Sequence, residues 1–528
     1  MITDSFKYFG LMEKMEVETL MLFTEAKSQP SNKMNAFNQF LHGVECDRFD
    51  KECKNMKKDL NSLSNIYKLR VRKWCTQKSP QQIFYSMYKD IALAQLKVYI
   101  LIEYSMTIQM VSGNGNFITE RNTVRHNYDE ITKIALSSLR NVTEKADRFL
   151  WRFDPSTHVP RVTYDEVTRL LQGYMENEVD LNTDESCRQT CNDYQNTTRS
   201  GCFEQKFCSQ QPQCSGRIHN CQFIDSVLSV CQSPENSFRR YEYIDYSEGR
   251  RLGEKVYCER PTNKLESWNS FIFYKCNYCF CVCDEQGPKS DRYFNLRETL
   301  SDVKANKVVT GVRFVKENRI LHLQIQQGEL LPGGLIDNST VDWEEVSNYK
   351  IDDPSVREGV DYHTLSYQRR SIDLDDVRID DDKTLVVTGV GFQVLDGHLN
   401  LKVRFSKFDF VEGQLIDPEV NSVWLANDNI YERQKLNLDG LDMPIRSEIK
   451  SKPLSQDTQY LEFTNSDIYK DASQSTIPFI DIQDVASIPP VALSGVGIYY
   501  KGVQGYGGFV APKIFSYDIS PHLPWINN

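Results

Sequence analysis

The chain of 528 residues is long enough for about three domains, and its 40% hydrophobic and 26% charged residues are typical of a soluble globular protein. A net charge of -11 excludes a general affinity for nucleic acid or anionic membrane surfaces, because both depend on clustered Lys and Arg. The sequence has no HExxH, GxSxG, P-loop or strand-terminal GxGxxG motif, so we expect no enzyme, no catalytic residues and no cofactor.

Residues 1–180 are predicted to form a helical bundle. Apolar residues recur at three-, four- and seven-residue steps over 56–74 and over 131–149, which places each set on one helical face. A capping-box pattern predicts a last helix over 163–174.

The segment 83–111 is apolar nearly all round, as expected of a helix enclosed by its neighbours near the centre of the bundle. Lys97 and Glu103 interrupt its apolar runs, so no stable membrane span is expected. A bundle of this kind could also join two copies of the chain as a homo-oligomer.

Residues 181–285 form a Cys-rich segment that is too polar to bury a large core, and 12 of the 15 cysteines lie there. In an oxidising compartment this pattern predicts disulfides that stabilise a loop-rich region. The predicted disulfide cysteines are Cys187, Cys191, Cys202, Cys208, Cys214, Cys221, Cys231, Cys258, Cys276, Cys279, Cys281, Cys283, Cys46 and Cys53. The run CNYCFCVC would also suit zinc, but its CxC spacing is tighter than usual, so no metal is expected. The odd total leaves one cysteine, such as Cys75, that is either buried or links two chains.

Three N-glycosylation sequons, at Asn141, Asn196 and Asn338, agree with an oxidising compartment. The N-terminal stretch 1–23 lacks the pattern of an ordinary signal peptide. The prediction that the protein is secreted and extracellular therefore depends on the cysteines and the sequons.

Residues 286–528 carry a β pattern that is written three times. VVTGVRF at 308–314 returns as VVTGVGF at 386–392 and, more faintly, within ALSGVGIYY at 492–500. Further along, GGLID matches GQLID. Each unit alone would leave its apolar face exposed to solvent, so three units are predicted to close around one core. The prediction is a multidomain α+β protein that ends in a three-fold pseudosymmetric β-prism, with a β-trefoil as the alternative.

Alternation within the first copy predicts that Val308, Thr310, Val312 and Phe314 share one face of a strand. Gly311 lies on the other face. We expect this glycine and its two equivalents to stand where another backbone comes close or where the strand bends.

Two stretches of the β region could hold a ligand. The acidic run with Asp373, Asp375, Asp376, Asp380, Asp381 and Asp382 has ligand atoms for calcium, but it lacks EF-hand spacing, and a solvated strand and turn is favoured. The loop Gly505, Tyr506, Gly507, Gly508 and Phe509 combines glycines with aromatic rings, as a glycan-binding lip would. The alternative for this loop is a tight turn.

Three stretches resemble a family of secreted insect proteins known only as a conserved region of unknown function. They are SMYKDIALAQLKVYILIEYSM, CSGRIHNCQFID and VVTGVRFVKENRILHLQIQQGELLPGGLIDNSTVDW. The resemblance covers most of the chain and implies export, with no catalytic residues to transfer.

The triple unit is also similar in pattern to β-prism proteins such as vitelline-membrane outer-layer protein and the jacalin-type lectins, which bind or associate with glycans. A helical bundle followed by a β-prism resembles insecticidal crystal toxins as well, but those lack a Cys-rich segment between the two.

These patterns favour a secreted, non-enzymatic binding or matrix protein whose partner is a glycan or another extracellular protein. The alternative is a membrane-active, pore-forming-like protein that inserts the apolar helix 83–111. A hydrolase with a site assembled from distant residues is a third hypothesis.

Overall fold

A computed structural model describes residues 77–224, 227–271, 274–429 and 432–523. The predicted helical stripe at 56–74 lies outside these ranges. The described chain divides into two compact units. The first comprises Pro80–Asp147 and the segment from Ile519, and the second comprises Gln77–Ser79 and Arg148–Asp518.

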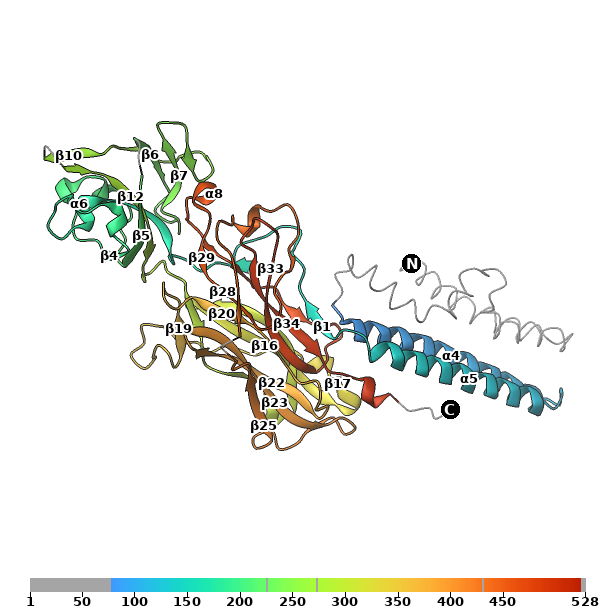
Figure 1. The fold of residues 1–528 in the computed structure, drawn as a ribbon. Coiled ribbons are helices and arrows are strands. Elements are labelled where there is room, and N and C mark those ends of the chain that lie inside the picture. The colour runs from blue at the N-terminus through green and yellow to red at the C-terminus, as the bar shows by residue number, and fades with distance from the viewer. Residues whose placement is uncertain (1–76, 225–226, 272–273, 430–431, 524–528) are drawn as a thin grey trace. The chain divides into compact units, whose positions relative to one another are not determined.

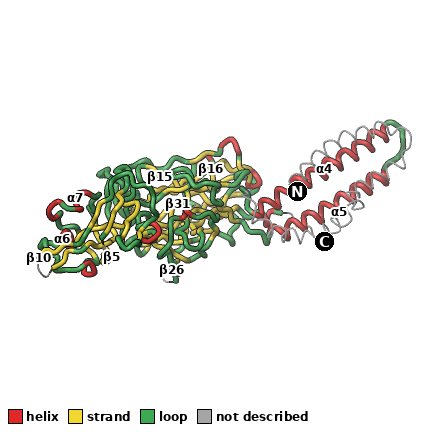
Figure 2. The backbone as a smooth tube through the Cα atoms, turned by 90° about the horizontal axis from the view of Figure 1, so that it is seen from above, coloured by secondary structure: helices red, strands yellow, loops and turns green. Residues whose placement is uncertain are grey.

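The first unit is built from two helices that lie side by side (Figures 1 and 2), α4 (Pro80–Val111) and α5 (Ile118–Thr143). Tyr99 of α4 stacks on Tyr128 of α5, with ring centroids 4.6 Å apart. The helix predicted over 83–111 is therefore confirmed. Within the described residues it is not enclosed, because large apolar side chains of α4 such as Tyr104 remain exposed.

Strands replace the helix that the sequence predicted over 163–174. They are β2 (Tyr164–Asp165) and β3 (Gln172–Asn177), and β1 (Phe149–Trp151) precedes them in the chain. Thr163 does not cap a helix, and its hydroxyl instead bonds the backbone of Val159. β2 pairs with a strand more than 300 residues away, so tertiary pairing overrides the local signal. The second unit is consequently mostly β.

The Cys-rich part of the second unit contains two four-stranded sheets, ordered β3-β12-β5-β4 and β8-β7-β6-β9, and a small hairpin, β10-β11. Its strands are β4 (Asn196–Thr198), β5 (Arg217–Phe223), β6 (Leu228–Gln232), β7 (Tyr241–Tyr246), β8 (Arg251–Leu252), β9 (Asn263–Leu265), β10 (Trp268–Phe271), β11 (Tyr274–Cys276) and β12 (Tyr278–Asp284). Its short helices are α6 (Glu178–Leu181) and α7 (Phe207–Gln210).

The remainder, from about residue 286 to 518, is called here the β domain. Its framework is three long antiparallel hairpins, one for each copy of the repeated motif. They are β15 (Lys307–Glu317) with β16 (Ile320–Leu331), β22 (Leu385–Leu395) with β23 (His398–Asp409), and β33 (Leu493–Gly502) with β34 (Phe509–Ser516).

Two short strands precede each hairpin and pair in the same way in all three copies. The first, β13 (Tyr293–Asn295), β20 (Ser371–Leu374) or β31 (Phe479–Asp481), runs parallel to the second strand of its own hairpin. The second, β14 (Thr299–Leu300), β21 (Asp376–Arg378) or β32 (Val485–Ala486), crosses to the next hairpin and pairs with β22, β33 or β15. Each unit thus gives one strand to the next, which closes the three sheets around one core.

A β-bulge falls at the same place in all three hairpins, at Thr310, Thr388 and Ser494. The extra residue reverses the alternation of faces. Val309 therefore joins Val312 in the shared core, and the prediction that placed Val308 and Thr310 on that face is wrong.

The repeated glycines lie directly beneath the crossing strands. A Cβ on Gly311, Gly389 or Gly495 would stand 3.0, 3.1 or 2.8 Å from a backbone oxygen of the strand that crosses it. This confirms the expectation of close backbone approach, so the triple motif is explained by folding.

A further strand extends each hairpin at the outer edge of its second strand: β18 (Asp342–Trp343) beside β16, β25 (Ser422–Ala426) beside β23, and β1 beside β34. The other elements of the domain are β17 (Leu335–Ile336), β19 (Tyr362–Thr364), β24 (Gln414–Leu415), β26 (Gln434–Leu436), β27 (Lys452–Pro453), β28 (Gln459–Glu462), β29 (Thr464–Asn465), α8 (Ile468–Asp471) and β30 (Thr476–Ile477).

Candidate functional site

All twelve cysteines of the Cys-rich part are paired, which confirms the predicted disulfides there. The bonds are Cys187–Cys276, Cys191–Cys279, Cys202–Cys208, Cys214–Cys283, Cys221–Cys281 and Cys231–Cys258. The other predicted pair, Cys46 and Cys53, and the odd Cys75 lie outside the described residues.

All four cysteines of CNYCFCVC form disulfides, each with a cysteine of the 187–221 segment. In the described part of the chain, three groups of acidic and cysteine side chains lie close enough to hold a metal. Every group contains a cysteine whose sulfur is in a disulfide, and only a thiolate would be a good ligand.

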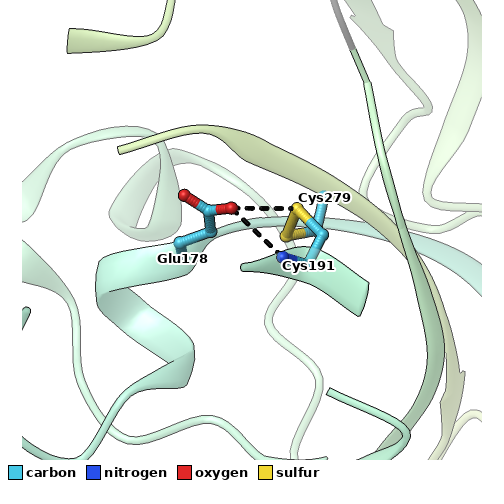
Figure 3. Close-up of side chains that lie close together, drawn as sticks. All are labelled: Glu178, Cys191 and Cys279. Atoms are coloured by element: carbon cyan, nitrogen blue, oxygen red, sulfur yellow. Dashed lines mark hydrogen bonds between the residues drawn. A yellow bond between two sulfur atoms is a disulfide. The ribbon is translucent and has the colours of Figure 1, made fainter. Parts of the chain in front are cut away.

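One of these groups is the Glu178 carboxylate beside the Cys191–Cys279 disulfide (Figure 3). One oxygen of Glu178 accepts the backbone N–H of Cys191 at 3.1 Å, and the other accepts the backbone N–H of Asn277 at 2.9 Å. Burial raises the pKa of Glu178, although these hydrogen bonds act in the opposite direction. The carboxylate satisfies backbone donors on both sides of the disulfide, so its role is structural.

A buried acid pair, Glu176 and Asp180, lies in the same region. The Tyr174 hydroxyl donates to Glu176, and Arg199 Nε lies 3.4 Å from the same carboxyl oxygen. Burial, and then the neighbouring charge of Asp180, raise the pKa of Glu176 to about 8. Glu176 therefore holds a proton at neutral pH.

The raised pKa of Glu176 makes the free energy of unfolding depend on pH. Because the folded pKa of Glu176 is raised, its contribution is complete below the ordinary pKa of 4.5 and is lost as the pH rises through about 8. We expect Glu176→Gln, which stays neutral, to remove this loss of several kcal/mol from thermal melts followed from acid to mildly alkaline pH. Glu248→Gln, at an exposed position, is the control and should keep the wild-type profile. Parallel profiles for Glu176→Gln and the wild type would contradict the assignment.

The predicted glycan loop is packed into the β domain. Phe509 is 1% exposed, and its ring stacks on His158 with centroids 4.9 Å apart. Gly507 and Gly508 are buried as well, whereas Gly505 turns with φ +87° and Tyr506 is half-buried. This burial corrects the expectation that Phe509 offers its ring to a sugar, and the segment is the tight turn of the alternative interpretation.

A buried ion cluster stands at the start of this turn. Lys501 Nζ lies 2.9 Å from Asp154 Oδ1 and 2.6 Å from Asp481 Oδ2, and it donates to the Arg152 carbonyl at 2.9 Å. Burial tends to raise the pKa of Asp154, but the charge of Lys501 and the backbone N–H of Ser451 outweigh it and hold the pKa below its ordinary value. The cluster links Asp481 of β31 and Lys501 of β33 to Arg152 and Asp154, which follow β1.

An ion pair whose cation lies over an aromatic ring recurs on the outer face of each of the three sheets, here called faces 1, 2 and 3. On face 1, Arg313 of β15 pairs with Asp484, with Nη1 to Oδ1 at 2.9 Å. Its guanidinium carbon lies 4.2 Å from the ring centroid of Trp343 on β18. The Trp343 side chain is partly exposed.

Face 2 repeats this arrangement. Lys402 of β23 pairs with Glu298 at 2.8 Å and lies 4.8 Å from the ring centroid of Trp424 on β25. Trp424, like Trp343, pairs with the residue that stands opposite the repeated glycine of its hairpin. The two tryptophans are therefore structural equivalents.

Face 3 keeps the ion pair but changes the aromatic group. Lys513 of β34 pairs with Asp376 at 2.6 Å, above the rings of Tyr499 and Phe515, which are both buried. The residue equivalent to the two tryptophans is Phe149 of β1.

The sequence contains one signal for these faces. GGLIDNSTVDW and GQLIDPEVNSVW begin with the matched five residues, and both end in the tryptophan of their face. The cation is harder to find, because it sits on the first strand of the hairpin in face 1 and on the second strand in faces 2 and 3.

The acidic run divides into two parts. Residues 380–382 are exposed, as expected of a solvated turn, but Asp373 and Asp375 are buried. Arg433 holds Asp375 through two hydrogen bonds of 2.8 Å, and His398 Nδ1 lies 2.8 Å from Asp373. The buried carboxylates are satisfied by these neighbours, which corrects the expectation of a solvated strand.

The sequon residues Asn141, Asn196 and Asn338 all have exposed side chains, so each is accessible to a glycosyl group. Among the residues that the structure describes, no helix is both long and apolar enough to cross a membrane.

No curated protein matches this sequence. Residues 72–325 match the family model described as a domain of unknown function (DUF4803), which agrees with the resemblance to a conserved region of unknown function. The match covers helices α4 and α5, the Cys-rich part and the first hairpin of the β domain as far as Ile325 in β16. Over residues 72–325 the chain is therefore similar to this family of unknown function.

Proposed function

We propose that the protein is a secreted, non-enzymatic binding protein whose β domain, a β-prism, recognises glycans through faces 1 and 2. The observation that carries this proposal is the recurrence of Trp343 and Trp424 at equivalent positions, each partly exposed beside an ion pair. An indole ring stacks on the apolar face of a sugar ring, and charged neighbours bond its hydroxyl groups.

Two further features support the proposal. Six disulfides in one segment suit an oxidising, extracellular compartment. Three sheets that exchange strands around one core fit a prism better than a trefoil.

The test is binding of the intact protein to a glycan array that includes chitin oligomers, with and without calcium. We expect a selective signal that becomes at least about tenfold weaker, the equivalent of 1.4 kcal/mol, when Trp343→Ala and Trp424→Ala are combined. Trp268→Ala is the matched control, because Trp268 lies outside both faces, in the Cys-rich part, where it packs against Tyr278 and the apolar cluster around it. Unchanged binding by the double variant, or a blank array, would overturn the proposal.

A membrane-active role is the second candidate. It is favoured by the exposed apolar side chains along α4, among them Ile100, Tyr104 and Ile108. Dye leakage from liposomes on addition of the intact protein would support it, and intact liposomes would exclude it.

A further inference from the structure

From the geometry of faces 1 and 2 we infer that each chain holds two equivalent sites for a neutral, repeating glycan. The inference rests on the proposed function and adds the charge class of the ligand and the number of sites.

The charge class follows from the ion pairs. Arg313 and Lys402 are each already neutralised by a carboxylate within 2.9 Å. A sulfated or otherwise anionic glycan would have to compete with Asp484 or Glu298 for the cation, on a protein of net charge -11. A neutral sugar needs no such exchange, because its hydroxyl groups can bond the outer atoms of the pair while the indole packs against its carbon face.

The number of sites follows from the register. Trp343 and Trp424 occupy equivalent positions on two different sheets of the same domain, so one sugar unit cannot contact both. On face 3 the cation lies over Tyr499 and Phe515, whose rings are buried, and Phe149 stands in the tryptophan position. Face 3 therefore lacks the exposed indole of the other two.

Each face is also wide enough for more than one sugar. The crossing strand (β32 or β14), the two hairpin strands and the edge strand (β18 or β25) span about 14 Å at the usual strand spacing. Two such faces on one rigid domain would bind a polymer more tightly than a short oligomer through multivalency.

The experiment is a calorimetric titration of the intact protein with the neutral hexamers of N-acetylglucosamine, β-1,3-glucose and β-1,4-glucose, and with a heparin hexasaccharide. We expect two sites per chain for at least one neutral hexamer and no binding of heparin. Trp343→Ala or Trp424→Ala alone should leave one site, and the combined variant should leave none. The Trp343→Ala and Trp424→Ala variants should keep the wild-type far-ultraviolet circular dichroism spectrum, which separates loss of the indole from misfolding.

The outcomes distinguish the two proposals. One site in the wild type, lost with a single tryptophan, would overturn the two-site inference and leave the proposed function standing. Preferential binding of heparin would overturn the neutral class. No binding of any hexamer, together with a blank glycan array, would overturn the proposed function itself.

Discussion

Lys501→Met is expected to destabilise the protein by roughly 3–5 kcal/mol in the free energy of unfolding. The ammonium group bridges Asp154 and Asp481, and all three side chains are less than 5% exposed. Removing the cation leaves two carboxylates close together in a site that water does not reach. A methionine of similar length preserves the packing, so the measured loss reports the charge. Urea denaturation of the intact protein gives the change.

Lys435→Met is the matched control, because Lys435 pairs with Glu462 at 2.8 Å while its side chain is 48% exposed. Solvent screens this pair, so we expect a change below about 1 kcal/mol. Equal effects of the two substitutions would contradict the view that the buried charge of Lys501 stabilises the β domain.

Reduction of the disulfides is expected to unfold the Cys-rich part while the β domain keeps its core. The cysteines of the Cys-rich part themselves form much of a buried cluster, together with Tyr174 and Ile218. The shared core of the three sheets contains no cysteine. Hydrogen exchange after treatment with a thiol reductant should show lost protection in β5 and β12 and retained protection in β15 and β22.

The length of the closed loops sets the size of this effect. In the loop-entropy model, a single cross-link such as Cys191–Cys279, over a separation of 88 residues, contributes about 4–5 kcal/mol, whereas Cys202–Cys208, over 6 residues, contributes about 2 kcal/mol. The variant Cys202→Ser with Cys208→Ser is the control and should leave β5 and β12 protected. Simultaneous loss of protection in both parts on reduction would show that they unfold as one unit.

The sequence predicts the parts of the fold that local patterns encode. The three hairpins, the close approach at Gly311 and the long helix from residue 83 follow from periodicity and from the repeat. The sequence does not predict the bulge at Thr310, because the residue types around it are those of an ordinary strand. The helix expected over 163–174 failed because the partner of Tyr164 is Asp481, far along the chain.

The candidate site was less predictable than the fold. The sequence does not show whether an aromatic side chain among glycines is exposed or buried, and the prediction that Phe509 lies at the surface is wrong. Faces 1 and 2 combine groups from separate units, as in the pair of Arg313 with Asp484, which are 171 residues apart. Only the crossing of strands between units brings such residues together.

The most direct test of glycan recognition by faces 1 and 2 is hydrogen exchange of the intact protein, with and without the neutral hexamer that binds most tightly. We predict new protection in β18 and β25 and in the hairpin strands beside them, with little change at α4. Protection confined to the Gly505–Phe509 turn or to α4, at a ligand concentration that saturates binding, would contradict the assignment of the site.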